Sequence, residues 1–317
     1  MNALVLGCAY AMDLIAGDPE WLPHPVRAMG RMIAAGETVA TPGRHAPVRD
    51  LIQGAVVTAV VVAATAAAAV AALRAARLIH PGVALAVEAL LAWTVLATGS
   101  LLREATRVIH ALDGDDIVSA RVLLARIVGR DTATLTESEV ARGVIETLAE
   151  STCDAIVAPL CFLAAGGVPA GLAYKAVNTL DSMIGHREPP YTYFGRVAAR
   201  LDDIANWIPA RLAAAAIAIA AACTGNNGAG ALRLWRRDHR NHDSPNAGHP
   251  EAAMAGALGV RLGGTNFYDG MAVSKPLIGA GNPAPGIDAA RAACRIVTAA
   301  SLVTFMAALL GALAWHA

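Results

Sequence analysis

The stretch LIQGAVVTAVVVAATAAAAVAAL, residues 51–73, decides the fold. It contains no charged residue, and a helix needs about 20 mostly apolar residues to cross the hydrocarbon core of a bilayer. The composition agrees, since 56% of the 317 residues are hydrophobic and only 16% are charged. Soluble domains carry closer to a quarter charged residues. We therefore expect an integral membrane protein built from helices.

Other apolar runs predict the remaining spans. The clearest are residues 1–16, 83–102 and 296–315. Two weaker runs are residues 150–168 and 207–223. Each weaker run predicts either a span or a re-entrant helix, because it reaches spanning length only by including flanking polar residues. The segment RAARLIH, residues 74–80, predicts a short turn between two spans.

Four polar segments separate the apolar runs. Residues 17–50 contain five prolines and are expected to be mostly loop. Residues 103–150 show the helical spacing of apolar residues, which predicts amphipathic helices outside the bilayer. Within them, Thr136 lies three residues before Glu139, which is typical of a capping box. The other two polar segments are residues 185–211 and 224–295.

Charge and cysteine content exclude several classes of protein. The formal net charge is zero, so nucleic acid is not expected as a partner. The five cysteines include no CxxC pair, which argues against a zinc site or a disulfide framework. The N-terminus lacks the basic region of a cleaved signal peptide. We expect one all-α, polytopic, membrane-embedded helical bundle over residues 1–317, with amphipathic or re-entrant helices and large polar loops.

The first polar constellation is DLIAGDPEWLPHPVR, residues 13–27. Asp13 lies within an apolar helix, where an acidic side chain is costly and usually functional. Asp18, His24 and Arg27 follow at once and are candidate substrate-binding residues. The same segment is also typical of turns, and Asp18 is equally suited to capping a helix.

The second constellation is ETLAESTCDAIVAPL, residues 146–160. Glu146, Glu150 and Asp154 recur every four residues, which places three carboxylates on one face of a helix. Like charges repel at that spacing, so a divalent cation or a basic partner would explain the pattern. A solvated face is the alternative, although the apolar run from Ile156 argues against it for Asp154.

The third constellation is YKAVNTLDSMIGH, residues 174–186. Lys175, Asn178 and Asp181 fall within about a third of the helix circumference. Lys175 and Lys275 are the only lysines in the chain. A single ammonium among apolar helices usually serves a phosphate or a carboxylate.

The fourth constellation is FGRVAARLDDIANWIPARL, residues 194–212. Its polar members share one predicted helix end: Arg196, Arg200, Asp202, Asp203 and Asn206. Carboxylate and amide oxygens suit Mg²⁺, which favours one or two carboxylates together with substrate phosphates.

The fifth constellation is RDHRNHDSPNAGHPEAAMAGALGVRLGG, residues 237–264. Arg237 supplies a cationic fork, and His242 lies a few residues on. Ser244, Asn246 and Gly248 belong to a predicted tight turn whose backbone N–H groups would cradle phosphate oxygens. The helix expected after this turn adds the favourable field of its N-terminus.

Taken together, these blocks resemble the CobD/CbiB family, the adenosylcobinamide-phosphate synthases of cobalamin biosynthesis. The matching blocks are GDPEWLPHPVRAMG, AESTCDAIVAPL, YKAVNTLDSMIGHREPPYTYFGRVAARLDDIANWIPARL and the fifth constellation. They occur in the family's order and cover essentially the whole chain. The string NTLDSMIG…DD…N.IPARL followed by SPNAG is highly specific.

The resemblance implies an ATP- and Mg²⁺-dependent amide ligation in the inner (cell) membrane, with an active site facing the cytoplasm. It joins a propionate carboxylate of the corrinoid adenosylcobyric acid to the amine of an aminopropanol phosphate or a related amino alcohol phosphate. Contacts with other late enzymes of the pathway and the oligomeric state stay open.

The constellations supply roles for this chemistry. Asp181, Asp202 and Asp203 are expected to hold Mg²⁺. Phosphate groups are expected to contact Lys175, Arg196, Arg200, Arg237 and the 244–248 turn. Glu150 or Asp154 is expected to act as the base or as a second metal ligand, with His242 as a reserve for proton transfer. The substrate-binding set is completed by Asp18, His24, Arg27, Asn178 and Asn206. We expect these groups to converge in one pocket.

Two further classes fit parts of the pattern. A Mg²⁺-dependent membrane transferase acting on a lipid pyrophosphate would use aspartate-rich helix ends, but its usual DDxxD spacing is absent. A non-catalytic membrane sensor or scaffold resembling the AmpE branch would not need buried carboxylates. A transporter is the weakest alternative, because no inverted repeat is evident.

Overall fold

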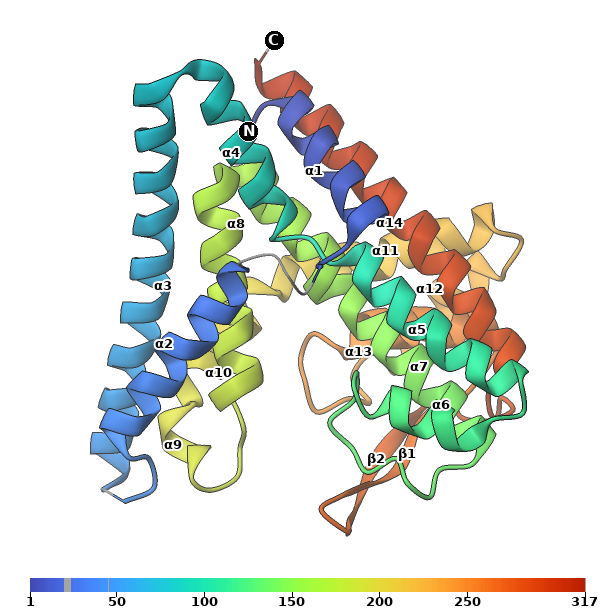
Figure 1. Ribbon diagram of the computed structural model, residues 1–317. Coiled ribbons are helices and arrows are strands. Elements are labelled where there is room, and N and C mark those ends of the chain that lie inside the picture. The colour runs from blue at the N-terminus through green and yellow to red at the C-terminus, as the bar shows by residue number, and fades with distance from the viewer. Residues whose placement is uncertain (20–23, 45, 317) are drawn as a thin grey trace. The chain divides into compact units, whose positions relative to one another are not determined.

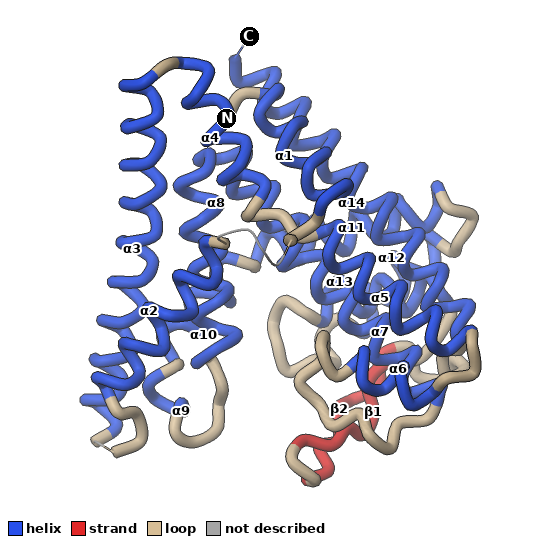
Figure 2. Tube along the Cα trace, viewed as in Figure 1, coloured by secondary structure: helices blue, strands red, loops and turns tan. Residues whose placement is uncertain are grey.

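The computed structural model describes residues 1–19, 24–44 and 46–316, and these are mainly helical (Figures 1 and 2). The chain forms two compact units, each assembled from separate segments. Unit 1 draws on residues 1–97, 158–206 and the end of the chain from residue 307. Unit 2 draws on residues 98–157 and 207–306. The residues Glu20 to Pro23, which fall within the GDPEWLPHP block, lie outside the described ranges.

Unit 1 is a set of packed helices. In chain order these are α1 (Ala3–Ala16), α2 (Pro25–Ala40), α3 (Pro47–Ile79), α4 (Pro81–Trp93), α8 (Ala158–Ile184), α9 (Tyr191–Phe194) and α10 (Arg196–Ala205). The long helix α3 packs against α8, α4 and α2, and α1 packs against α4. Helix α8 is broken at Gly167, whose φ of 64° is left-handed, two residues before Pro169. The apolar run of residues 150–168 therefore ends at a kink and not at a loop.

Unit 2 contains the remaining elements. These are α5 (Thr98–Asp113), α6 (Ile117–Leu124), α7 (Glu137–Ser151), the π-helical turn η1 (Thr152–Val157), α11 (Trp207–Cys223), α12 (Gly228–Asp238), α13 (Gly248–Leu258), β1 (Leu262–Tyr268), β2 (Met271–Ile278) and most of α14 (Ile287–His316). Helix α13 packs against α12, α11 and α7 and is buried from Gly248 to Ala257. Because α13 is so deeply buried, any polar side chain on it must be satisfied inside the unit.

Four helical stretches among the described residues are long and apolar enough to cross a membrane: Pro47–Ile79, Pro81–Asp113, Glu137–Ile184 and Ile287–Leu313. A fifth would be formed by α10 and α11, which are bent by 48° relative to each other. The expected polytopic helical membrane protein is therefore confirmed. The span expected over residues 1–16 is wrong, because α1 has only 14 residues and is too short to cross a bilayer. Helices α5, α6 and α7 lie in residues 103–150, where amphipathic helices were expected, and two of the four apolar stretches extend into that segment. The Thr136–Glu139 capping box at the start of α7 is complete.

Two close backbone approaches inside unit 1 require glycine. A Cβ atom on Gly54 in α3 would lie 1.8 Å from the carbonyl oxygen of Phe194. A Cβ atom on Gly195 would lie 1.6 Å from the carbonyl oxygen of Ile184. Neither neighbour can yield, since both are backbone atoms. The absence of a side chain at these positions lets α9 lie directly on α3 and lets α10 follow α8 closely.

Two loop expectations were wrong because proline begins helices here. The segment 17–50 was expected to be mostly loop, yet α2 begins at Pro25 with the His24 side chain accepting a hydrogen bond from the Val26 N–H. Helix α3 likewise begins at Pro47. The turn expected over residues 74–80 shrinks to His80, because α3 continues to Ile79 and α4 starts at Pro81. Proline is favourable at the first helical position, where its missing N–H would have no partner anyway.

The span expected over residues 83–102 is interrupted. Helix α4 ends at Trp93 and α5 begins at Thr98. At the break, the indole N–H of Trp93 donates to the carbonyl oxygen of Gly17, 3.0 Å away. The run of residues 83–102 is apolar, as expected, but apolar content does not reveal where a helix is interrupted.

The β1–β2 hairpin is the one described departure from the all-helical expectation. Tyr268 pairs with Met271 around a two-residue turn, in which Asp269 has φ 48° and Gly270 has φ 76°. Asp-Gly is a favoured pair for such a turn because both residues need positive φ. No strand was expected in this polar segment, although its Asp-Gly pair is typical of a hairpin turn.

Candidate functional site

The structure places the predicted site residues in two sets, one in each unit. In unit 1, the end of α8 carries Asp181, and α10 carries Asp202 and Asp203, close enough for the charges of the three carboxylates to interact. Asp202 Oδ2 accepts a hydrogen bond from the side-chain amide of Asn206, 3.0 Å away. The Asn206 oxygen in turn accepts from the Tyr174 hydroxyl at 3.0 Å. This chain of contacts fixes one oxygen of Asp202 against the helices.

The other oxygen of Asp202 is distinctive. Asp202 Oδ1 is buried and makes no hydrogen bond to the described residues. A buried carboxylate oxygen without a donor is unfavourable unless a ligand satisfies it. Asn178, one of the predicted binding residues, lies beside the same carboxylate. The predicted pairing of Asn178, Asp181, Asp202 and Asn206 is therefore present.

The cationic members of this set are more exposed. The guanidinium of Arg200 lies 3.6 Å from the Asp203 carboxylate, but the Arg200 side chain is 72% exposed, so this contact adds little stability. Arg196 is also exposed, and Lys175 is half-buried on α8. Among these three cations, a contact with the aspartates is described for Arg200.

A metal ion bound here would take only some of its ligands from the protein and the others from the substrate and water. No group of three His, Cys, Asp or Glu side chains in the described ranges is arranged to hold a metal ion by itself. Mg²⁺ commonly takes only one or two carboxylates and fills its other positions with water and phosphate oxygens. The unpaired Asp202 oxygen, next to Asp181 and Asp203, fits that mode of binding.

Two of the predicted residues of the N-terminal segment, Asp18 and His24, have a structural role. His24 Nε2 lies 3.3 Å from Asp18 Oδ1, while His24 Nδ1 accepts from the N–H of Val26 at the start of α2. Arg27 is exposed on the first turn of that helix. Asp18 and His24 are thus brought together, as a pair that anchors the beginning of α2.

Unit 2 contains a cavity of about 230 Å³ that sequence analysis did not foresee as a whole. Six acidic, basic or imidazole side chains line it: Arg130, Glu146, Glu150, His242, Glu251 and Lys275. They come from the loop before α7, from α7 itself, from the turn before α13, from α13 and from β2. The combination of three carboxylates with cations in so small a space marks a binding or catalytic site.

Glu146 holds the wall of this cavity together. Its carboxylate lies 2.7 Å from the Arg130 guanidinium and accepts the N–H of Gly263 at 2.9 Å. Arg130 also donates to the side-chain oxygen of Asn266 at 2.6 Å. The side chains of Arg130 and Glu146 are only 6% and 15% exposed. The pair therefore fastens the hairpin to α7, which is a structural role.

His242 and Glu251 form the polar centre of the cavity. The ring of His242 accepts the Ser244 N–H at Nδ1, 3.0 Å away, so neutral His242 carries its hydrogen on Nε2. Nε2 lies 3.4 Å from Glu251 Oε1. Burial, followed by the charges of Glu146 and Glu150, raises the pKa of Glu251 well above its usual value. Burial and the nearby Lys275 lower the pKa of His242.

Only two of the three stacked carboxylates share this cavity. Glu146 and Glu150 line it, whereas Asp154 does not. Asp154 lies in the π-helical turn η1, whose wider turn ends the regular spacing of α7. The expectation of one face for all three residues assumed an uninterrupted α-helix, and the π-helical turn interrupts it before Asp154.

The 244–248 turn satisfies much of its own backbone. Ser244 Oγ accepts the N–H groups of Asn246 and Ala247, each at 3.2 Å. Gly248 is needed here, since a Cβ atom would lie 2.2 Å from the carbonyl oxygen of His239. These two N–H groups are engaged within the turn, so a phosphate bound there would compete with Ser244.

Arg237 is held by its neighbour. Its Nε and one terminal nitrogen donate to the two carboxylate oxygens of Asp238, at 2.6 and 2.8 Å. The buried Asp238 also accepts the N–H of Gly279 at 2.7 Å. This arrangement lowers the pKa of Asp238, chiefly through the Arg237 hydrogen bonds. Asp238 therefore joins the end of α12 to the segment after β2, while Arg237 pairs with Asp238 and does not line the cavity.

Three residues of the cavity were missed as site residues. Glu251 follows the HP pair that begins α13, and its position on a buried helix was not evident from the sequence. Arg130 lies in a loop without any motif. Lys275 did carry a signal, because it is one of two lysines in the chain, but the hairpin that delivers it was not predicted.

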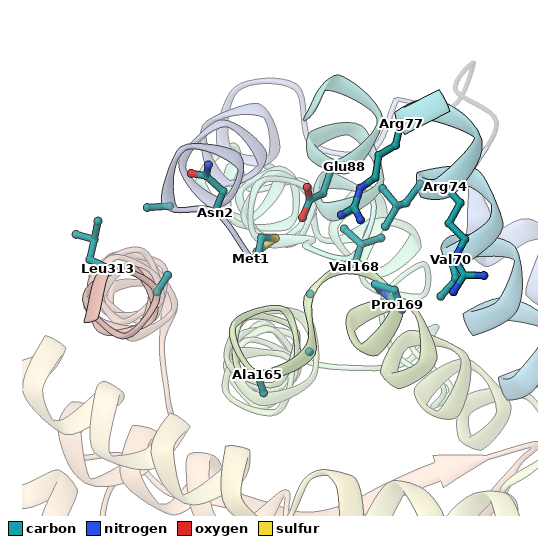
Figure 3. A pocket seen from close by; sticks show the side chains of 15 residues that line it. Met1, Asn2, Val70, Arg74, Arg77, Glu88, Ala165, Val168, Pro169 and Leu313 are labelled. Atoms are coloured by element: carbon teal, nitrogen blue, oxygen red, sulfur yellow. The ribbon is translucent and has the colours of Figure 1, made fainter. Parts of the chain in front are cut away.

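A larger cavity of about 720 Å³ lies in unit 1, and none of the predicted site residues lines it. Figure 3 shows Arg74 and Arg77 from α3 and Glu88 from α4 among its lining side chains. Most of the other lining residues are apolar. It is separate from the ionisable cluster of unit 2.

The fold and the ionisable clusters define a multi-pass helical membrane protein with built polar sites. Comparison with known proteins specifies it further. The family model described as CobD/Cbib protein matches residues 6–297. The chain therefore belongs to the CobD/CbiB family, whose curated members are named as cobalamin biosynthesis proteins.

Individual relatives cover nearly the whole chain. The cobalamin biosynthesis protein CobD of Geobacter metallireducens is 48% identical over 91% of this chain and 89% of its own length. CobD of Pelobacter propionicus is 45% identical over 94% and 91%. The cobalamin biosynthesis protein CbiB of Salmonella arizonae is 42% identical over 97% and 98%. No solved structure matches the chain.

Proposed function

We propose that this protein joins adenosylcobyric acid to an amino alcohol phosphate, such as aminopropanol phosphate, by an ATP- and Mg²⁺-dependent amide ligation. Membership in a family of cobalamin biosynthesis proteins supports a role in that pathway. The observation that carries the reaction class is the unit 2 cavity, where Glu150, His242, Glu251 and Lys275 meet. An inner-membrane location with a cytoplasmic site belongs to the same proposal.

Amide formation from a free carboxylate needs activation. Attack of the carboxylate on the γ-phosphorus of ATP forms a C(=O)–O–P bond and releases ADP. The amine nitrogen then forms the C–N bond while the acyl C–O bond breaks, and inorganic phosphate leaves with the bonding pair. Hydrogen-bond donors and cations that stabilise the developing charges supply most of the rate enhancement in such steps.

The attacking amine must first lose a proton. A buried carboxylate or a neutral imidazole is a suitable acceptor when it lies within reach of the amine. Glu150 and Glu251 line the cavity and are the candidates for the general base. Neutral His242 presents its Nε2–H toward Glu251, while its Nδ1 accepts the Ser244 N–H.

The unit 1 set is assigned to ATP. Asp202, with Asp181 and Asp203, would hold Mg²⁺, which would neutralise charge on the phosphate oxygens when bound. Lys175, Arg196 and Arg200 would contact the phosphates of ATP. The unpaired buried oxygen of Asp202 supports this assignment.

A reconstituted assay tests the proposal. Purified protein in nanodiscs would receive ATP, Mg²⁺, adenosylcobyric acid and aminopropanol phosphate, with amide product and ADP measured together. We expect equal amounts of both and no product when any one component is omitted. ATP hydrolysis without amide product, or product without ATP, would contradict the proposal.

A further inference from the structure

The unit 2 cavity is small, which limits what it binds. Its volume of about 230 Å³ is below the range typical of sites for drug-sized ligands. A corrinoid is far too large to enter it as a whole. A molecule of a few heavy atoms, with charges that match the lining, is the appropriate occupant.

Lys275 is the uncommitted cation of this cavity. Arg130 is paired with Glu146 at 2.7 Å, so its charge is already balanced. By contrast, no ion pair or hydrogen bond joins the Lys275 ammonium to any side chain in residues 1–19, 24–44 or 46–313. Its charge nevertheless acts on His242 and Glu251. Lys275 is thus available for an anionic group that enters the cavity.

Glu251 and His242 offer the opposite chemistry. The Glu251 side chain is 7% exposed, and its described ion-pair partner is His242 at 3.4 Å. The Glu251 carboxylate can accept a hydrogen bond or a proton from an ammonium group, while neutral His242 presents its Nε2–H toward that carboxylate. Glu150, from the neighbouring helix α7, lines the same space. The cavity therefore presents a cation and a proton-accepting carboxylate to one small ligand.

We propose that this cavity is the binding site for the amino alcohol phosphate, with Lys275 at the phosphate and the Glu251–His242 pair at the amine. The inference rests on the proposed ligation and assigns the binding site of one of its substrates, the amino alcohol phosphate, to this cavity. The ammonium gives one proton to the Glu251 carboxylate, and the resulting amine attacks the activated carboxylate. As the C–N bond forms and the C–O bond breaks, the second N–H proton leaves to the departing phosphate or to water.

Binding of the substrate alone tests the site without relying on turnover. The dissociation constants of aminopropanol phosphate, aminopropanol and propanediol phosphate would be measured on detergent-solubilised protein without ATP or corrinoid. Lys275→Met should weaken both phosphate compounds by roughly tenfold or more and leave aminopropanol unchanged. Glu251→Gln should weaken both amines and leave propanediol phosphate unchanged.

Matched variants guard against a general loss of folding. Arg126→Met removes an exposed cation of unit 2 that does not line the cavity and should leave all three constants unchanged. Lys275→Arg keeps the charge and should retain phosphate binding. Equal effects of Arg126→Met and Lys275→Met, or no effect of Lys275→Met, would overturn the site.

Failure of the site and failure of the proposed reaction are distinguishable. Ligation by the wild-type protein with a KM for aminopropanol phosphate that Lys275→Met does not change would refute the site and leave the reaction standing. Selective binding that follows the variants as expected, without any amide product, would refute the reaction and leave the site standing.

Discussion

His242 Nε2 lies 3.4 Å from Glu251 Oε1, and both side chains are largely withdrawn from solvent. Nine positions separate the two residues along the chain, and the 244–248 turn folds one back onto the other. The turn fixes the imidazole through the Ser244 N–H, while the buried helix α13 fixes the carboxylate. The pair is therefore positioned before any ligand enters.

The raised pKa of Glu251 predicts a pH-dependent stability. A folded-state pKa above the unfolded value stabilises the protein fully below the unfolded pKa, near 4.5, and this contribution is lost as pH rises through the folded pKa. Glu251→Gln cannot ionise. We expect the melting temperature of Glu251→Gln, relative to wild type, to rise from pH 5 to pH 8 in detergent.

Glu137→Gln, at an exposed position on the first turn of α7, is the control and should show no such trend. A difference between Glu251→Gln and wild type that stays constant or falls with pH would contradict a folded-state pKa of Glu251 above its unfolded value.

The Arg130–Glu146 pair predicts a large loss of stability on truncation. Arg130→Met leaves the buried Glu146 carboxylate with only the longer ion pair to Arg142 at 3.9 Å among the described residues, which should lower the free energy of unfolding by about 3 kcal/mol. Arg107→Met removes an exposed partner of Glu104 and should cost less than about 1 kcal/mol. Thermal unfolding of both variants in the same detergent measures the contrast, and equal losses would rule out a fastening role for Arg130.

Gly54 predicts a steric limit on the packing of unit 1. Gly54→Ala places a methyl group 1.8 Å from the Phe194 carbonyl oxygen, so α3 and α9 must separate. We expect a loss of about 3 kcal/mol. Gly7→Ala in α1 meets no atom within 4 Å and should be neutral or slightly stabilising, because alanine favours helix. Comparable melting temperatures for the two variants would argue against this close approach.

Substitution of the unit 1 aspartates is expected to lower turnover without preventing folding or membrane insertion. Asp202→Asn and Asp203→Asn should each reduce kcat by about 100-fold or more, since a neutral amide neither balances phosphate charge nor binds Mg²⁺ well. Membrane insertion and melting temperature should be retained. Asp288→Asn, which changes a side chain 90% exposed on α14, should keep its activity within about twofold. Full turnover in Asp203→Asn would remove that residue from the metal role.

The spans were predictable because their signal is local. The run at residues 51–73 has no charge and lies wholly within α3. Helix starts were harder, since the prolines at positions 25 and 47 suggested loops and in fact begin α2 and α3. The same residue type breaks a helix interior and favours its first turn, so composition alone does not distinguish the two uses.

The site was predictable only in part, because it depends on packing between distant segments. Asp181 and Asp202 were grouped from their polar motifs, and the structure places their carboxylates near each other. Glu251 was missed, since its importance comes from the burial of α13 among α7, α11 and α12. Lys275 was noticed as a rare lysine, but only the hairpin register places it beside His242.

Isotope transfer tests the central claim of amide ligation most directly. Adenosylcobyric acid labelled with ¹⁸O in the reacting carboxylate would be incubated with ATP, Mg²⁺, aminopropanol phosphate and the protein. If ATP activates the carboxylate as an acyl phosphate, one ¹⁸O atom per amide formed appears in inorganic phosphate. Amide product accompanied by phosphate free of ¹⁸O would contradict the account.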